Sequence, residues 1–285
     1  MQKSLNLKAA FVSSLLVFLV IGVWYLATLQ GAAGGTTGMT AEQIEYQKML
    51  GKDPGTAKSN GFPTPGQMGQ TIWTHLSNPV YDNGPNDKGI LIQLGHSLGR
   101  VGLGFLLAWT VAVPLGFVIG MSTLLSRALN PFIQVLKPIS PLAWMPLALY
   151  TIKDSSASGV FVIFICSIWP MLINTAFGVA SVRNDWLNVA RTLEVSPLRK
   201  AFLVILPAAA PTILTGMRIS MSIAWLVIVA AEMLVGGTGI GYFVWNEWNN
   251  LSLTNVLFAI GVIGIVGMLL DLCFGRLQKL VTYVE

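Results

Sequence analysis

Charged residues leave four long gaps in the sequence. The gaps lie between Lys8 and Glu42, Arg100 and Arg127, Asp154 and Arg183, and Glu247 and Asp271. Roughly 20 apolar residues in a helix, each rising about 1.5 Å, cross the hydrocarbon core of a bilayer. Backbone groups in lipid must find hydrogen bonds within their own segment, so such stretches form helices. The pattern predicts about six transmembrane helices, at 9–29, 94–121, 131–151, 158–180, 210–233 and 253–274.

The third of these stretches is interrupted by proline. It contains Lys137, Pro138, Pro141 and Pro146. A proline lacks the backbone N–H that a helix interior uses, and its ring clashes with the preceding turn. We therefore expect a kinked or broken helix here instead of a straight span.

The composition agrees with a membrane protein. Of 285 residues, 54% are hydrophobic and only 10% are charged, whereas a soluble domain has about 25% charged residues. The apolar run at 9–29 is longer than the core of about 7–15 residues in a cleaved signal peptide, so we interpret it as a retained helix. The chain is predicted to be an all-α polytopic membrane protein.

Lysine and arginine predict the orientation of the spans. With the N-terminus inside and an even number of spans, most basic residues fall on the inner side: Lys3, Lys8, Arg127, Arg183, Arg191, Arg199, Lys200, Arg218, Arg276 and Lys279. Short segments rich in these residues stay in the cytoplasm. We therefore expect both termini to be cytoplasmic.

Three parts follow from this pattern: an N-terminal transmembrane helix at 1–30, an extracytoplasmic loop at 31–93 and a core at 94–285. The loop contains a candidate short polar helix at 41–51 and an amphipathic segment at 68–80. Trp73 and His75 in the second segment suit a membrane interface. This segment is either a connector helix on the membrane surface or a docking surface for an extracytoplasmic partner.

Residues that would carry chemistry are scarce. The histidines are His75 and His96, while Cys166 and Cys273 fall on different spans, which favours packing over a disulfide or a metal site. The segment GGTGIGYF at 236–243 follows a membrane helix, so it predicts a tight turn and not a nucleotide-binding loop. No Walker A sequence is present, and the basic residues border spans instead of forming a nucleic-acid patch. We expect neither an enzyme nor a nucleic-acid-binding protein.

The most distinctive polar segment lies at 182–211, between the fourth and fifth spans. Asn184 or Asp185 is a candidate cap for a first short helix, and Ser196 is a candidate cap for a second helix that begins at Pro197. On the first helix, three apolar residues recur at a spacing of three: Leu187, Ala190 and Leu193. Such a helix either fits a groove in a soluble partner or serves as an elbow that positions the fifth span.

This segment resembles the cytoplasmic loop of ABC importer permeases. The pattern of that loop is Glu-Ala-Ala, three residues, Gly, nine residues, Ile, one residue and Leu-Pro. Aligned on Leu206 and Pro207, it places the Glu-Ala-Ala on 188–190, the Gly on Glu194 and the Ile on Val204. The spacing is kept, but Asn188 replaces a charged residue, and Glu194 adopts a left-handed turn less easily than Gly.

The resemblance extends from about residue 62 to the C-terminus. The residues that carry it include HSLGRVGLGFLLAWTVAVPLGFVIGM, NPFIQVLKPISPLAWMPLALY, FVIFICSIWPMLINTAFGV and GMRISMSIAWLVIVAAEML. Together they are similar to the nitrate, sulfonate, taurine and bicarbonate family of ABC permeases. The INTAFGV and KDSSASG passages are most similar to nitrate permeases, with bicarbonate permeases nearly indistinguishable.

The resemblance implies a type I importer permease in the bacterial inner membrane. Its expected substrate is a small oxyanion, nitrate first with nitrite as a second ion on the same route, and bicarbonate or sulfonate and taurine are the alternatives. A secondary carrier or channel is a more distant alternative. The expected partners are ABC ATP-binding subunits, an extracytoplasmic solute-binding protein and a second copy of the chain. ATP and Mg²⁺ would be bound by the ATP-binding subunits, and this chain would bind no cofactor itself.

The same resemblance assigns residues of the loop to contact with the ATP-binding subunit. They are Asp185, Leu187, Asn188, Ala190, Arg191, Leu193, Glu194 and Pro207. Closure of the ATP-binding pair would move these short helices and reorient the spans. The chain would transmit force and would not catalyse a reaction.

Several residues are candidates for the substrate pathway. His96 and Arg100 lie four apart on one helical face near the outer end of the second span, where they either meet an anion or, for Arg100, reach the interface. Lys137, in the proline-broken segment, either attracts an anion or extends to the cytoplasm. Trp144 and Trp169 either narrow a pore or pack against other helices.

Two acidic residues inside predicted spans need partners. Glu232 would repel an anionic solute, so we expect it to pair with an outer basic residue or a helix terminus. Arg218 and Asp271 lie at similar depths on the fifth and sixth spans and are predicted to form an ion pair. The glycines at 116 and 120 and at 261, 264 and 267 are predicted to allow close helix packing.

Overall fold

The computed structural model describes residues 2–32, 62–84 and 87–281. These residues are almost entirely helical, and the one β-type pairing among them is an isolated bridge between Asp82 and Lys88. The polar helix predicted at 41–51 lies outside the described residues. The chain separates into two compact units, 1–78 with 250–258, and 79–249 with 259–285.

The smaller unit contains α1 (Gln2–Ala32), α3 (Pro65–Ser77) and the start of α12 (Leu253–Val281). The indole of Trp24 donates a hydrogen bond to the carbonyl of Pro63 at 2.9 Å, which joins α1 to the beginning of α3. Thr64 and Gln67 form a reciprocal capping box that fixes the first turn of α3. The predicted amphipathic segment is therefore helical, although it begins at Pro65, three residues earlier than expected.

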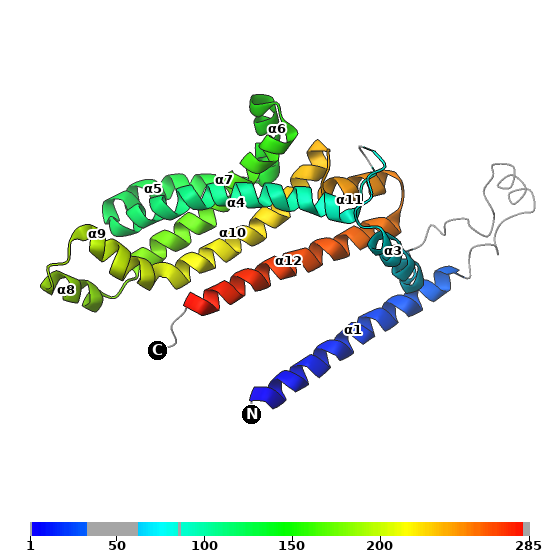
Figure 1. Cartoon of the computed structure of the whole chain (residues 1–285), viewed down its shortest axis with the longest axis horizontal. Coiled ribbons are helices and arrows are strands. Elements are labelled where there is room, and N and C mark those ends of the chain that lie inside the picture. The colour runs from blue at the N-terminus through cyan, green and yellow to red at the C-terminus, as the bar shows by residue number, and fades with distance from the viewer. Residues whose placement is uncertain (1, 33–61, 85–86, 282–285) are drawn as a thin grey trace, which may run out of the picture. The chain divides into compact units, whose positions relative to one another are not determined.

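The core of the larger unit is formed by α4 (Ile90–Met121), α7 (Ser155–Ala180) and α10 (Leu206–Val235), which run side by side (Figure 1). Glycines permit the close approach of α4 to α7. A Cβ atom at Gly116 would lie 2.7 Å from the carbonyl oxygen of Leu172, and one at Gly120 would lie 2.5 Å from that of Ala176. The predicted packing role of these two glycines is confirmed.

The glycines of α12 differ from those of α4. A Cβ atom at Gly261 or Gly264 would meet nothing within 4 Å in the described chain, whereas one at Gly267 would lie 3.2 Å from Trp225. The prediction of close packing is therefore wrong for the first two positions within this chain. Trp225 also donates from its indole nitrogen to the carbonyl of Ile263 at 3.0 Å, so it is one of the side chains that hold α12 against α10.

The third predicted span is broken, as the prolines indicated. It consists of α5 (Thr123–Leu136) and α6 (Pro141–Ile152), which meet at an angle of 89°. Pro138 lies in the break, and Pro141 opens α6 at a position where its missing N–H leaves no hydrogen bond unmade. The break directs α6 away from the axis of α5 (Figure 1).

Five helices among the described residues are long and apolar enough to cross a membrane, or six when the bent pair counts as one span. These helices coincide with the six predicted stretches. The fifth is longer than predicted, because α9 (Pro197–Lys200), a π-helical turn η2 (Ala201–Ile205) and α10 form one continuous helical run, Pro197–Val235. The chain is a multi-pass membrane protein.

Candidate functional site

The loop between α7 and α10 folds into α8 (Asn184–Thr192) and α9. The predicted caps of the first helix are wrong: the N-cap residue is Arg183, one residue before Asn184, and it makes no side-chain capping hydrogen bond. Asp185 instead lies in the first turn, where its charge favours the positive end of the helix dipole. Ser196 does precede α9 and Pro197 opens it, but the Ser196 side chain makes no capping hydrogen bond.

The end of α8 is a Schellman motif centred on Glu194. The Glu194 amide donates to the carbonyl of Arg191 at 3.0 Å, and the Val195 amide donates to that of Ala190 at 3.0 Å. Glu194 has φ of 49°, in the left-handed region that favours glycine. The permease pattern has Gly at this position, and Glu194 takes up the conformation that Gly would adopt there.

One side of α8 packs against the bundle and the other side is exposed. The apolar residues that were predicted to share one face lie on both sides. Ala190 is buried, and Leu187 is half-buried against a core cluster of Val179, Ile205, Ala209 and Ile213. Leu193 is instead 70% exposed. Ala190 and Leu187 therefore anchor α8 to the bundle, and the exposed surface of the loop comes from other residues.

Two exposed apolar residues of α8 were not among the predicted contact residues. Val189 is 59% exposed and Trp186 is 41% exposed, at positions i+3 and i of the helix, with Leu193 at position i+7 on the same face. The sequence holds a signal for them, because apolar side chains on a short polar helix that does not cross the membrane are unusual unless they are covered. Together with Leu193 they form an apolar patch at the tip of the bundle.

The α8–α9 loop is joined to α10 without a flexible break. In η2 the amide of Leu206 donates to the carbonyl of Ala201, five residues back, where an α-helix would use the residue four back. Pro207 follows at once and has no N–H to donate. The proline of the permease pattern thus lies next to a widened turn between the short helices and the span.

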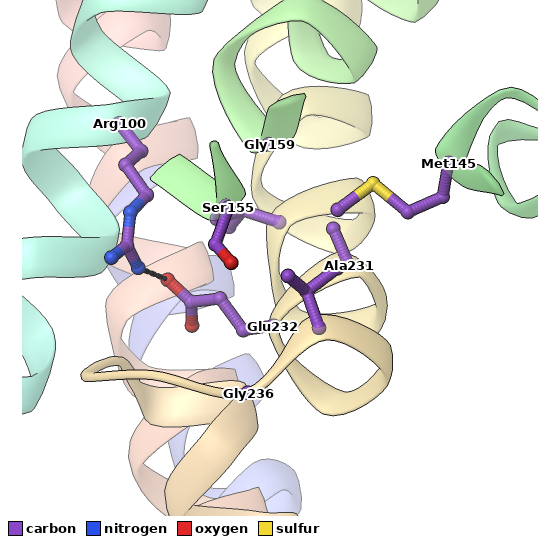
Figure 2. Close-up of a pocket in the computed structure, with 9 residues that line it drawn as sticks. Arg100, Met145, Ser155, Gly159, Ala231, Glu232 and Gly236 are labelled. Carbon is purple, nitrogen blue, oxygen red and sulfur yellow. Dashed lines mark hydrogen bonds and ion pairs between the residues drawn. The ribbon is translucent and has the colours of Figure 1, made fainter. Parts of the chain in front are cut away.

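At the opposite end of the bundle, a buried cluster of polar groups surrounds Glu232. Arg100 Nη1 lies 2.7 Å from Glu232 Oε1 and also donates to the carbonyl of Thr238 at 2.7 Å, while its Nε donates to Ser156 Oγ at 3.0 Å. The side chains of Arg100 and Glu232 are 14% and 3% exposed. Figure 2 shows the guanidinium pointing to the carboxylate.

The same cluster fixes the glycine-rich turn that follows α10. The amide of Gly241 donates to Glu232 Oε2 at 3.0 Å, that of Ile240 to Ser97 Oγ at 2.9 Å, and that of Gly239 to Gln93 Oε1 at 2.6 Å. A Cβ atom at Gly239 would collide with the carboxylate of Glu232. The segment is therefore a tight turn at the start of α11 (Ile240–Asn249), closed onto α4 and α10.

Glu232 has both kinds of partner that the sequence predicted for it, a basic residue and the amide groups at a helix start. The sequence interpretation missed Gln93 and Ser97, which complete the cluster. Their spacing holds a signal, because Gln93, Ser97 and Arg100 occupy positions i, i+4 and i+7 and so lie on one face of α4. Three polar residues on one face of an otherwise apolar helix indicate a shared polar contact.

The space beside this cluster is small. A cavity of about 10 Å³ is lined by Arg100, Glu232 and Gly236 on one side and by Met145 of α6 on the other (Figure 2). Such a volume holds about one water molecule. In this conformation Arg100 is therefore committed to protein groups, and His96 is exposed on α4 away from that set of hydrogen bonds.

A second ion pair joins α10 to α12. Arg218 Nε and Nη2 lie 2.6 and 2.5 Å from the two carboxylate oxygens of Asp271, in a bidentate arrangement. Gly275, one turn from Asp271, lies beside the guanidinium, where a Cβ atom would make an ordinary van der Waals contact of 3.6 Å with Arg218 Cζ. The structure thus places Arg218 and Asp271 in the contact that the sequence indicated.

The other pathway candidates are dispersed. Trp144 and Trp169 are half-buried on α6 and α7. Lys137, at the end of α5, lines a groove of about 540 Å³ between α5, the end of α4 and the end of α7. No group of three His, Cys, Asp or Glu side chains in the described ranges could hold a metal ion.

The sequence is similar to that of a known protein family and of individual transport proteins. Residues 112–282 match the family model of the binding-protein-dependent transport system inner membrane component. The chain is 43% identical over 230 residues to the nitrate import permease protein NrtB of Synechocystis sp. (strain ATCC 27184 / PCC 6803 / Kazusa), covering 81% of this chain and 84% of the relative. It is also 43% identical over 218 residues to the bicarbonate transport system permease protein CmpB of the same organism, covering 74% and 78%.

A solved structure has the same fold at low identity. A chain of the inward-facing MetNI methionine ABC transporter superposes with a TM-score of 0.61 at 13% identity, covering 68% of this chain and 96% of that chain. The family match extends over more than half of the sequence and includes the α8–α9 loop, the broken span and α12. The chain therefore belongs to the family of inner membrane components of binding-protein-dependent transport systems, the permease subunits of ABC importers.

Proposed function

We propose that this chain is the permease subunit of an ATP-driven importer of nitrate. The observation that carries the proposal is the 43% identity to a nitrate import permease over 81% of the chain. Bicarbonate is the second candidate, because a bicarbonate permease is equally identical over a slightly shorter length. Both ions are small, singly charged oxyanions, so a change of a few side chains along the route would separate them.

The chain is proposed to work with partners that supply energy and solute. A pair of ATP-binding subunits would bind ATP and Mg²⁺, and an extracytoplasmic binding protein would deliver the anion. Two copies of the permease would form the translocation unit, with both termini and α8 in the cytoplasm. The positive residues at 183, 191, 199 and 200 around α8 and α9 support this orientation.

The exposed patch of Trp186, Val189 and Leu193 is proposed to be the surface that contacts the ATP-binding subunit. It is apolar, 41–70% exposed, and carried on a short helix that is anchored from behind by Leu187 and Ala190. The uninterrupted run from α9 through η2 into α10 supports its role, because movement of α8 would be passed directly to a span. Asn188 and Arg191, which are exposed elsewhere on α8, would contribute polar contacts beside the patch.

Copurification tests the partner surface. We expect Val189→Asp to reduce recovery of ATP-binding subunits with the tagged permease on the order of tenfold, since a buried charge at an interface centre costs about 2 kcal/mol or more. Leu251→Asp is the matched control, because Leu251 is 81% exposed and lies far from α8 in the chain. Equal recovery of partners with both variants would argue against the proposed surface.

An uptake assay tests the substrate. In a strain that lacks this chain, restored expression should restore uptake of labelled nitrate, and unlabelled nitrite, bicarbonate and taurine are added as competitors. Nitrate uptake that needs the ATP-binding subunits supports the proposal. Restored bicarbonate uptake without nitrate uptake would assign the second candidate, and nitrate transport by the purified chain alone in liposomes would identify a carrier instead.

A further inference from the structure

The broken third span has a polar face whose side chains take no part in the contacts described above. All polar residues of α5 and its end fall on one side: Thr123, Ser126, Arg127, Asn130, Gln134 and Lys137. At 100° per residue these positions occupy an arc of about 100°. The remaining arc is apolar and exposed, with Phe132 at 65% and Val135 at 68%. A helix of this kind must turn its polar face toward water or protein, because lipid offers no hydrogen bonds.

The polar face of α5 lines the groove of about 540 Å³. The opposite wall is formed by the end of α4, at Ile119 and Gly120, and by the last turns of α7, including Ala176. Since α7 leads directly into α8, the groove lies at the end of the bundle that carries the α8–α9 loop. At about 30 Å³ per water molecule, such a volume holds on the order of ten or more waters, enough to surround a small ion.

The groove is positively charged. Arg127 and Lys137 are the charged residues of its lining, and none of the lining residues is acidic. Among the described residues, neither side chain forms a salt bridge or a hydrogen bond. Arg100 and Arg218 behave differently, because Arg100 is paired with Glu232 and Arg218 with Asp271. The positive charge of the groove is therefore not cancelled by any acidic side chain among the described residues.

The geometry points to a binding passage for the transported oxyanion in the α5 groove; this inference rests on the proposed function and deepens it. Lys137 and Arg127 are separated by ten residues of helix, about 15 Å, so they attract an anion at two successive places. Asn130 and Gln134 lie between them, and Ser126 is next to Arg127; all three supply neutral donors. Weak, repeated sites of this kind let an ion enter and leave, as conduction requires.

Thiol labelling of the purified permease tests the charge of the groove without transport. The background carries Cys166→Ala and Cys273→Ser, since these are the cysteines of the chain. The Asn130→Cys variant is then modified by an anionic or a cationic methanethiosulfonate reagent of similar size. We expect the anionic reagent to react about tenfold faster, because a cleft lined by one sign of charge concentrates the opposite ion. Phe132→Cys, on the apolar face of the same helix, is the control and should show no such preference.

Further variants and a protection experiment test whether Lys137 and Arg127 bind the anion. In the Asn130→Cys background, Lys137→Gln should remove most of the anionic preference, Lys137→Arg should retain it, and Lys153→Gln, outside the groove, should leave it unchanged. Millimolar nitrate should slow labelling of the thiol at position 130.

In the assembled transporter, Lys137→Gln and Arg127→Gln should raise the KM for nitrate about tenfold with normal assembly, whereas Lys153→Gln should not.

The outcomes separate this inference from the proposed function. Equal labelling by both reagents, or an unchanged KM in both groove variants, would overturn the passage while leaving nitrate import intact. Protection of the thiol at position 130 by phosphatidylglycerol vesicles but not by nitrate would overturn it in favour of a lipid headgroup site. Protection by bicarbonate but not by nitrate would support an anion passage and correct the substrate.

Discussion

The two ends of the helical core handle charge in opposite ways. At the end near the glycine-rich turn, the largely buried Arg100 is paired with the buried Glu232, and only about 10 Å³ of space adjoins them. At the end near α8, Arg127 and Lys137 line a groove of about 540 Å³ and have no carboxylate partner among the described residues. The ion pair of Arg100 and Glu232 therefore holds its end of the bundle closed, whereas the cations Arg127 and Lys137, unpaired within the described part of the chain, are free to attract an anionic ligand.

The largest effect is expected from breaking the closed end. Glu232→Gln leaves the buried guanidinium of Arg100 without its counter-charge, which for a buried pair costs about 3–5 kcal/mol. We expect loss of most folded protein, measured by size-exclusion chromatography and thermal unfolding in detergent. The double variant R100Q/E232Q should recover much of the loss, because neither charge then remains alone. A single variant as stable as the parent would show that the cluster does not hold this end closed.

A smaller loss of stability is expected when the glycine-rich turn is crowded. Gly239→Ala places a methyl group against the carboxylate of Glu232, and overpacking of this kind costs about 1–3 kcal/mol. Gly102→Ala is the control, because a Cβ atom there meets nothing within 4 Å and the change favours a helix. Thermal unfolding should separate the two variants, and equal melting temperatures would contradict the tight closure.

The ion pair of Arg218 and Asp271 is more exposed to solvent than the pair of Arg100 and Glu232, since both of its side chains are about 40% exposed. Asp271→Arg and Arg218→Asp should each lower expression and melting temperature, but less than Glu232→Gln does. The double exchange should restore both quantities, because the bidentate pair can form in the reverse sense. Failure of the double exchange to restore them would show that the contact is incidental.

The smallest effect is expected at the end of α8. Glu194→Gly removes the side chain from a residue with φ of 49°, and relief of a left-handed conformation is worth about 1 kcal/mol. We expect a slightly higher melting temperature. Thr192→Gly, two residues earlier and inside the helix, should instead lower it by a similar amount. A gain at both positions would indicate a general effect of flexibility and not the turn conformation.

Contacts at the candidate sites differ in how far the sequence predicts them. The ion pair on α10 and α12 was predictable, because two lone charges at equal depth in adjacent spans have few alternatives. The patch on α8 was only partly predictable, because a spacing of three identified Leu187 and Ala190 as apolar neighbours but did not reveal which face is covered. Ala190 is buried and Leu187 packs against residues of η2 and α10, and that covering is a property of the packed bundle.

The spans, the break in the third span and the position of the polar loop can all be predicted from the amino-acid sequence alone. These depend on windows of about 20 residues and on single prolines, whose cost in lipid or in a helix does not depend on distant residues. The packing of the helices was needed to show that Arg100 pairs with Glu232, 132 residues away. It was also needed to show that Arg127 and Lys137 have no acidic partner among the described residues. Partnership between distant charges follows from which helices pack together, and helix packing is fixed by side-chain fit across the whole bundle.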